Sequence, residues 1–81
     1  MQPKDTSDFS FTILKSLGVL SKSTGGWTKE LNVISWNGRP PKFDIREWSP
    51  DHKKMGRGIT LTKQEAYKIM MCFQQYPQKE A

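Results

Sequence analysis

The stretch KFDIREW, residues 42–48, decides the fold, because it has the clearest alternation in the chain. A period of two places successive side chains on opposite faces of a β-strand. One face carries Phe43, Ile45 and Glu47, and the other carries Lys42, Asp44, Arg46 and Trp48. The segment therefore predicts a strand with one largely apolar face and one charged, aromatic face.

Two further strands precede this one. From Phe9 the alternation of apolar residues predicts a strand of about a dozen residues, with a bulge at Gly18. The polar, glycine-containing run 21–26 reads as a hairpin loop, and residues 27–36 read as the second strand. Asn37-Gly38 then predicts a tight turn, because both residue types tolerate positive φ.

After residue 48 the period changes. Residues 49–58 are basic and rich in turn formers, which predicts a loop, and residues 59–61 predict a short fourth strand. Thr62 and Glu65 form a capping box that starts a helix. Its apolar stripe is Ala66, Ile69, Met70 and Phe73, flanked by Tyr67, Met71 and Tyr76, and Pro77 ends it.

The expected fold is α+β, with four antiparallel strands followed by one C-terminal helix. We expect a disordered lead-in over residues 1–8, one domain over 9–76 and a short tail over 77–81. With 81 residues the chain is marginal as a monomer, and its single cysteine and lack of a Cys/His cluster leave no disulfide or metal to stabilise it. A helix that covers only part of a sheet also leaves apolar surface exposed, so a homodimer is predicted.

Charge is concentrated in the middle of the chain. The net charge is +5, and residues 22–63 hold nine of the 13 Lys and Arg but only four of the eight Asp and Glu. The remainder carries four of each sign and is neutral. All three tryptophans lie in the same basic window, which indicates an anionic partner.

The residue patterns argue against an enzyme. The sequence has no nucleophile-base motif, no phosphate loop and no metal-ligand spacing, so we expect no catalysis, cofactor or small-molecule substrate. His52 is interpreted as a surface loop residue without a triad or metal partner, and Cys72 as a small buried apolar residue. No apolar run is long enough to span a membrane, and a cytoplasmic location is expected, associated with the nucleoid if the protein is bacterial.

The run 43–48, with Gly56-Arg57-Gly58-Ile59-Thr60-Leu61-Thr62 after a basic loop, resembles the positive cofactor four family of transcriptional coactivators, in particular its bacterial YdbC-type branch. Residues 26–31 and 35–38 are typical of the bacterial members, and the resemblance spans residues 9–73. It implies a curved four-stranded sheet with a C-terminal helix, dimerised so that two sheets present grooves to single-stranded DNA.

The resemblance also implies a set of DNA contacts. These are a basic strand position, a base-stacking aromatic residue, an arginine, a loop lysine and the basic residue before a glycine. Arg46 and Arg57 match the arginine and the basic residue before a glycine, and either Lys53 or Lys54 matches the loop lysine. Trp36 lies within one residue of the aromatic position, and Lys29 lies near the basic strand position.

Single-stranded nucleic acid requires aromatic platforms together with cations. We expect both from side chains interleaved on neighbouring strands, namely Trp27, Lys29, Trp36, Lys42, Arg46, Trp48 and Arg57, with Lys53 and Lys54 in the loop. Several of these have a structural alternative. Trp27 belongs equally well to the core, Trp48 is favoured to pack under the following loop, and Arg46 has Asp44 and Glu30 as alternative partners.

The function predicted from the sequence is sequence-tolerant binding of single-stranded DNA, linked to transcription regulation or DNA maintenance. Two alternatives remain open at this point. One is RNA binding, because a stacking surface accepts either backbone. The other is an interaction module whose basic face meets an acidic protein of the transcription machinery.

Overall fold

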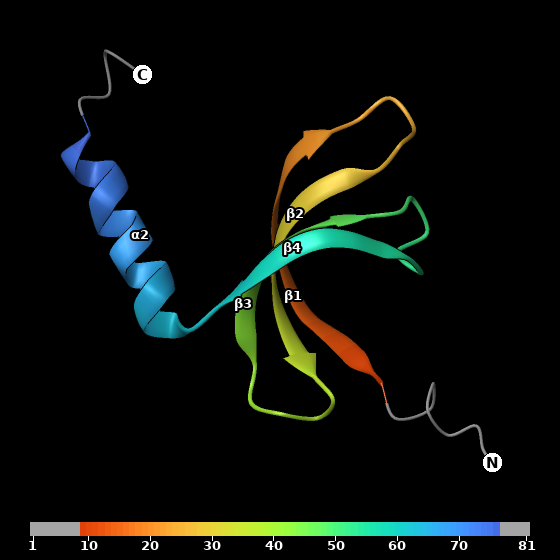
Figure 1. The fold of residues 1–81 in the computed structure, drawn as a ribbon, viewed down its shortest axis with the longest axis horizontal. Coiled ribbons are helices and arrows are strands. Elements are labelled where there is room, and N and C mark those ends of the chain that lie inside the picture. Colours follow the sequence, from red (N-terminus) through yellow and green to blue (C-terminus); the bar gives the residue numbers. More distant parts are fainter. Residues whose placement is uncertain (1–8, 77–81) are drawn as a thin grey trace.

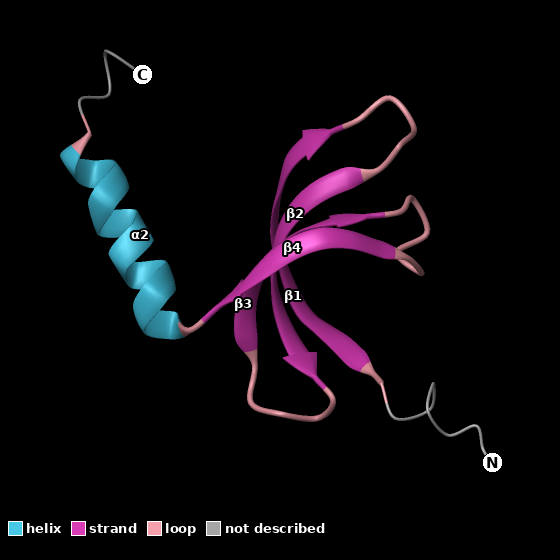
Figure 2. Ribbon diagram, in the orientation of Figure 1, coloured by secondary structure: helices cyan, strands magenta, loops and turns pink. Residues whose placement is uncertain are grey.

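The computed structural model describes residues 9–76, and the expected lead-in, tail and Pro77 lie outside this range. The elements are the strands β1 (Phe11–Lys22), β2 (Thr28–Trp36), β3 (Lys42–Trp48) and β4 (Met55–Leu61), followed by the helix α2 (Lys63–Gln75). The strands form one antiparallel sheet in the order β1-β2-β3-β4, and the helix extends away from its end (Figures 1 and 2). The predicted α+β architecture is confirmed.

Strand β1 is bulged at three places where the sequence predicted one bulge at Gly18. Its register against β2 shifts between residues 13 and 15, 16 and 18, and 19 and 21. Each shift leaves one β1 residue without a residue opposite it on β2, namely Leu14, Leu17 and Leu20, and all three are exposed. Bulges bend a strand and increase its twist, so this edge strand bends along the strongly curved sheet of Figure 1.

The sheet buries one of its faces within its own curvature. We call it the inner face; on β2 and β3 it carries Thr28, Glu30, Asn32, Ile34, Trp36, Lys42, Asp44, Arg46 and Trp48. The rings of Phe11 and Trp48, which come from opposite ends of the strands, meet at 5.3 Å, and Phe11 also lies 5.9 Å from Trp36. Ile34 and Trp48 are completely buried. The deepest core therefore lies on the face whose pattern is charged and aromatic.

The opposite, outer face carries Lys29, Leu31, Val33, Phe43, Ile45, Glu47, Arg57, Ile59 and Leu61. Strand β4 begins at Met55, four residues before the predicted start. The prediction failed because two glycines were taken for loop signals. Gly58 pairs with Arg46, and a Cβ on it would lie 2.1 Å from the Arg46 Cβ, so glycine here permits close strand approach.

Helix α2 starts as predicted. The Thr62 hydroxyl accepts from the Glu65 amide at 3.1 Å, and the Glu65 carboxylate accepts from the Thr62 amide at 2.8 Å. Between the helix and the outer face lies an apolar hollow of about 470 Å³, lined by Leu31, Phe43, Lys63, Ala66, Tyr67, Ile69, Met70 and Phe73. No residue of α2 is buried, and the prediction of a buried Cys72 is wrong because the helix projects from the sheet.

Candidate nucleic-acid interface

A row of charged side chains, Lys29, Glu47 and Arg57, crosses the outer face. It lies near the loop end of the sheet, which is the end that carries the loop between β3 and β4 (residues 49–54). Lys29 on β2 lies opposite Glu47 on β3, and Arg57 on β4 precedes the Gly58 that pairs with Arg46. Lys29 and Arg57 are exposed and line a depression of about 350 Å³, whose apolar wall comes from Ile45 and Ile59. The row therefore places two cations beside an apolar surface.

Trp27 extends this row at the start of β2. It is half-buried and lines a small hollow with Lys29 and Glu47. A Cβ on Gly56 would lie 3.7 Å from its Cζ3 atom, so the indole packs beside the glycine segment of β4. Trp27 thus lies next to the cations, although it is only partly exposed.

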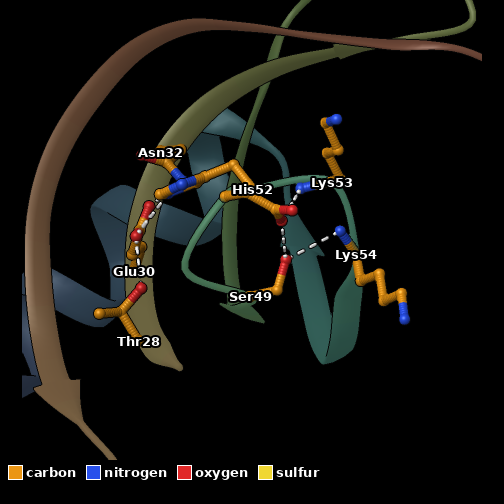
Figure 3. Close-up of polar contacts among 8 residues, drawn as sticks. Thr28, Glu30, Asn32, Ser49, His52, Lys53 and Lys54 are labelled. Atoms are coloured by element: carbon orange, nitrogen blue, oxygen red, sulfur yellow. Dashed lines mark hydrogen bonds and ion pairs between the residues drawn. The ribbon is translucent and has the colours of Figure 1, made fainter. Parts of the chain in front are cut away.

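The loop between β3 and β4 carries Lys53 and Lys54 and is braced by its own polar groups. The Ser49 hydroxyl donates to Asp51 at 2.8 Å and accepts from the Lys54 amide at 3.0 Å. The Lys53 amide donates to Asp51 at 3.0 Å; this bond, and then that from Ser49, lower the pKa of Asp51. Both lysines are exposed, and Figure 3 shows their side chains directed away from β2.

Arg46 lies on the inner face, in a network that uses most of its guanidinium. Its Nε and Nη2 atoms donate to Asp44 at 2.8 and 2.9 Å, and Nη1 donates to the carbonyl of Gly56 at 3.3 Å. Thr60 donates to the same carboxylate at 2.8 Å. The Arg46 side chain is 16% exposed, and of its two alternative partners it pairs with Asp44.

The other inner-face residues of the predicted site differ in exposure. The Arg46 guanidinium lies 5.0 Å from the Trp36 ring, and Trp36 is half-buried beside Phe9 and Phe11. Trp48 is fully buried, in keeping with the favoured packing role, so it offers no face for stacking. Lys42 is exposed at the start of β3, at the strand end farthest from the loop.

A buried polar cluster occupies the inner face near the same loop (Figure 3). Glu30 is 4% exposed and accepts from Thr28, from Asn32 at 3.2 Å and from His52 at 2.8 Å. Burial raises the pKa of Glu30, but these three hydrogen bonds and the His52 charge outweigh it and leave the pKa below 4.5. The sequence pattern gave no sign of this cluster. His52 is exposed in its loop, as predicted, and its hydrogen bond to the buried Glu30 is a contact that the pattern did not indicate.

The structure divides the predicted site between the two faces. The outer face and the loop hold Trp27, Lys29, Lys53, Lys54 and Arg57, whereas the inner face holds Trp36, Lys42, Arg46 and Trp48. The reason is the two-residue period of a strand. Lys29 pairs with Glu47, and the next pair along the two strands, Glu30 with Arg46, directs its side chains to the opposite face. The predicted residues therefore lie on neighbouring strands, as expected, but on two different faces of the sheet.

Comparison with known proteins identifies the family of this sheet and helix. The family model described as transcriptional coactivator p15 (PC4) matches residues 23–71, which include β2, β3, β4 and most of α2. The chain belongs to the PC4 family. The matched segment contains the charged row and the loop of the outer face together with the Arg46 network.

A relative in Treponema pallidum (strain Nichols), described only as an uncharacterized protein, is similar to this chain. The two are 57% identical over 58 residues, which cover 72% of this chain and 68% of the relative. Membership in the PC4 family implies DNA binding and a function connected with transcription, and the family is non-enzymatic.

Two further observations concern the described residues 9–76, one on metal ligands and one on membrane spans. They contain no group of three or more His, Cys, Asp or Glu side chains arranged to hold a metal ion. In the same range, α2 is too short and too polar to cross a membrane.

Proposed function

We propose that the protein binds single-stranded DNA without marked sequence preference, as a homodimer, through the loop end of the outer face. The observation that carries this proposal is the depression in which Lys29 and Arg57 flank Ile45 and Ile59. A flexible single strand presents phosphates and unstacked bases together, and this surface offers cations and apolar contacts side by side.

The cations suit a phosphate chain that passes over β2 and β4 and then over the loop. Lys29, Arg57, Lys53 and Lys54 are exposed, whereas Glu47 is the acidic residue within the row. Exposed lysines and arginines attract phosphates by releasing condensed counterions, so binding of this kind weakens with salt. The net charge of +5 also favours a negatively charged partner.

Base contacts on this surface come from Trp27 and the two isoleucines. Ile59 is 55% exposed and lies opposite Ile45, and Trp27 borders the row at the start of β2. Stacking and apolar contact do not distinguish strongly among bases, which supports sequence tolerance. Arg46 and Trp36 then support the sheet from its inner face, where Arg46 neutralises the buried Asp44.

The homodimer is supported by apolar surface that one protomer leaves uncovered. On α2, Ile69, Met70 and Met71 are 37%, 48% and 39% exposed, and the apolar hollow lies between this helix and the outer face. Large exposed apolar patches commonly mark association sites. A second copy seated there would cover the helix while the charged row, nearer the loop end, stays open to DNA.

The proposal is tested by fluorescence anisotropy with a labelled oligo-dT of about 20 nucleotides, long enough for more than one binding site of typical size. Unlabelled duplex DNA and a matched RNA serve as competitors. Weak competition by duplex and RNA is the expected result, with log affinity falling by roughly 0.7 per phosphate contact for each tenfold rise in salt. Competition by duplex or RNA as strong as that by unlabelled oligo-dT, or no binding of oligo-dT at low salt, would reject the proposal.

A further inference from the structure

His52 adopts the left-handed backbone conformation. Its φ is 60°, in a region that residues other than glycine adopt uncommonly, although asparagine, aspartate and histidine are enriched among those that do. The only other non-glycine residue with positive φ in the described chain is Asn37, which lies in the tight turn after β2.

Two contacts hold the His52 ring. Its Nε2 atom lies 2.8 Å from the Glu30 carboxylate of β2, and the ring stacks on Trp48 of β3 at 5.7 Å with an interplanar angle of 25°. Glu30 and Trp48 are 4% and 0% exposed, so both anchors are fixed parts of the inner face. The His52 side chain itself remains 42% exposed. One side chain thus joins a surface loop to two buried groups.

The same loop carries Lys53 and Lys54 on its opposite side (Figure 3). Ser49 and Asp51 hold the loop internally, and the Ser49 amide donates to the Lys54 carbonyl at 3.0 Å. Among the side-chain hydrogen bonds of the described residues 9–76, the bond from His52 to Glu30 is the one that ties this loop to β2. His52 therefore adds a contact outside the loop to those that place the two lysines.

We propose that His52 is a positioning residue that clasps the β3–β4 loop to β2 through Glu30 and makes the placement of Lys53 and Lys54 dependent on pH. The proposal rests on the proposed function only for its effect on DNA binding. Histidine is the side chain that changes charge between about pH 5 and pH 8. The protonated ring and the ionised carboxylate attract each other, so the clasp tightens at the acidic end of this range and loosens at the basic end.

The charged groups around His52 agree with this direction. Glu30 of β2 faces the ring directly, and Lys22 of β1 lines the hollow of about 490 Å³ that both share. From its own loop come Asp51, Lys53 and Lys54, and both lysines point away from Glu30 in Figure 3. The buried Glu30 carboxylate, at 2.8 Å, is the closest of these charges, so it determines whether a charge on His52 strengthens or weakens the contact.

Direct contact between protonated His52 and a phosphate would also strengthen DNA binding at low pH. The two mechanisms differ in their dependence on Glu30. A clasp loses its pH response when Glu30→Gln removes the carboxylate charge, whereas a phosphate contact keeps it. His52→Asn is a matched variant, because asparagine tolerates the left-handed backbone while lacking the titrating ring.

The experiment measures amide hydrogen exchange by NMR in the free protein at about pH 5.5 and about pH 8, the span over which histidine titrates. For residues 52–54 of the wild type, we expect protection, corrected for intrinsic exchange, to be about threefold higher at the lower pH, as for a partly exposed ion pair. Glu30→Gln and His52→Asn should each abolish that difference. Amides of β3 report whether either variant alters the fold.

The same variants are then titrated with oligo-dT at both pH values. A pH-dependent affinity that disappears in Glu30→Gln supports the clasp, and one that survives in that variant overturns it in favour of a phosphate contact. Loop protection that is independent of pH in the wild type also overturns it. A pH-dependent loop in a protein that binds no oligo-dT would support the clasp and reject the proposed function.

Discussion

The inner and outer faces of one sheet use charged residues in opposite ways. On the inner face, Asp44 is fully buried and holds Arg46, which is 16% exposed, in a two-bond pair. On the outer face, Lys29 and Arg57 are exposed beside the apolar wall of a depression. The inner charges satisfy one another, while the outer charges face solvent.

The two faces differ because of burial. Strong curvature turns the charged, aromatic face of the pattern inward, where polar groups must find partners within the protein. Under the proposed function, the surface that meets DNA is therefore the outer face, which carries Lys29 and Arg57. Each prediction below strengthens or contradicts this division.

The largest effect should come from crowding the inner face at β4. Gly58→Ala places a Cβ 2.1 Å from the Arg46 Cβ and 2.5 Å from the Ile45 carbonyl oxygen, so the strands must separate. We expect a loss of about 3 kcal/mol or more in the free energy of unfolding, measured by urea denaturation. Gly18→Ala is the control, since a Cβ added there would meet nothing within 4 Å, and it should cost less than about 1 kcal/mol. Equal costs would contradict the close approach.

Breaking the pair on the inner face should be the next largest effect. Asp44→Ala leaves a mostly buried guanidinium without its carboxylate, and we expect a loss of roughly 3 kcal/mol, at the low end for a broken buried ion pair. Arg46→Ala should be similarly destabilising, with strong non-additivity in the double variant. If Arg46→Ala leaves stability unchanged and only weakens DNA binding, the structural role assigned to the pair is wrong.

Substitutions on the outer face should weaken DNA binding and leave the free energy of unfolding almost unchanged. Lys29→Ala and Arg57→Ala should each weaken oligo-dT binding by roughly threefold to tenfold and lower the salt slope by about 0.7. Their free energies of unfolding should stay within about 0.5 kcal/mol of the wild type, since both side chains are exposed. Lys68→Ala, which removes the same charge from α2, is the control and should bind normally. Equal weakening by Lys68→Ala would indicate general charge attraction.

The smallest effect concerns acid stability of the inner face. The pKa of Glu30 lies below its ordinary value of 4.5 in the folded protein, so its contribution to stability is present above that value and is lost as the pH falls through the folded pKa. Glu30→Gln should therefore flatten the decline in stability below about pH 4.5, measured by denaturation at several pH values. An unchanged acid profile would mean that the hydrogen bonds to Glu30 do not favour its ionised form.

Much of the fold follows from local patterns in the sequence. Strand β3 has its predicted bounds, because period-two alternation and the flanking turn signals agree there. The capping box at Thr62 sets the start of α2 in the same way. The early start of β4 was missed because glycines are typical loop signals, although Gly58 serves the close approach of two strands.

The site was harder to predict, because it depends on curvature and register. Alternation divides the residues of each strand between two faces, but only the pairing of β2 with β3 shows that Lys29 and Arg46 lie on opposite faces. The contact between His52 and Glu30 joins residues 22 positions apart through a left-handed backbone, and no local pattern encodes it. Cys72 was misplaced because the helical period shows which residues share a stripe, but not whether another element covers it.

The most direct test of the division between the faces is a ¹⁵N NMR titration of the protein with oligo-dT. We predict that the largest shift changes fall on the amides of Lys29, Glu47 and Arg57 and on the loop that carries Lys53 and Lys54, with small changes at the buried Asn32 and Ile34. Changes centred on Asn32 and Ile34 instead, with the Lys29 and Arg57 amides unmoved, would contradict the division and return the binding site to the inner face.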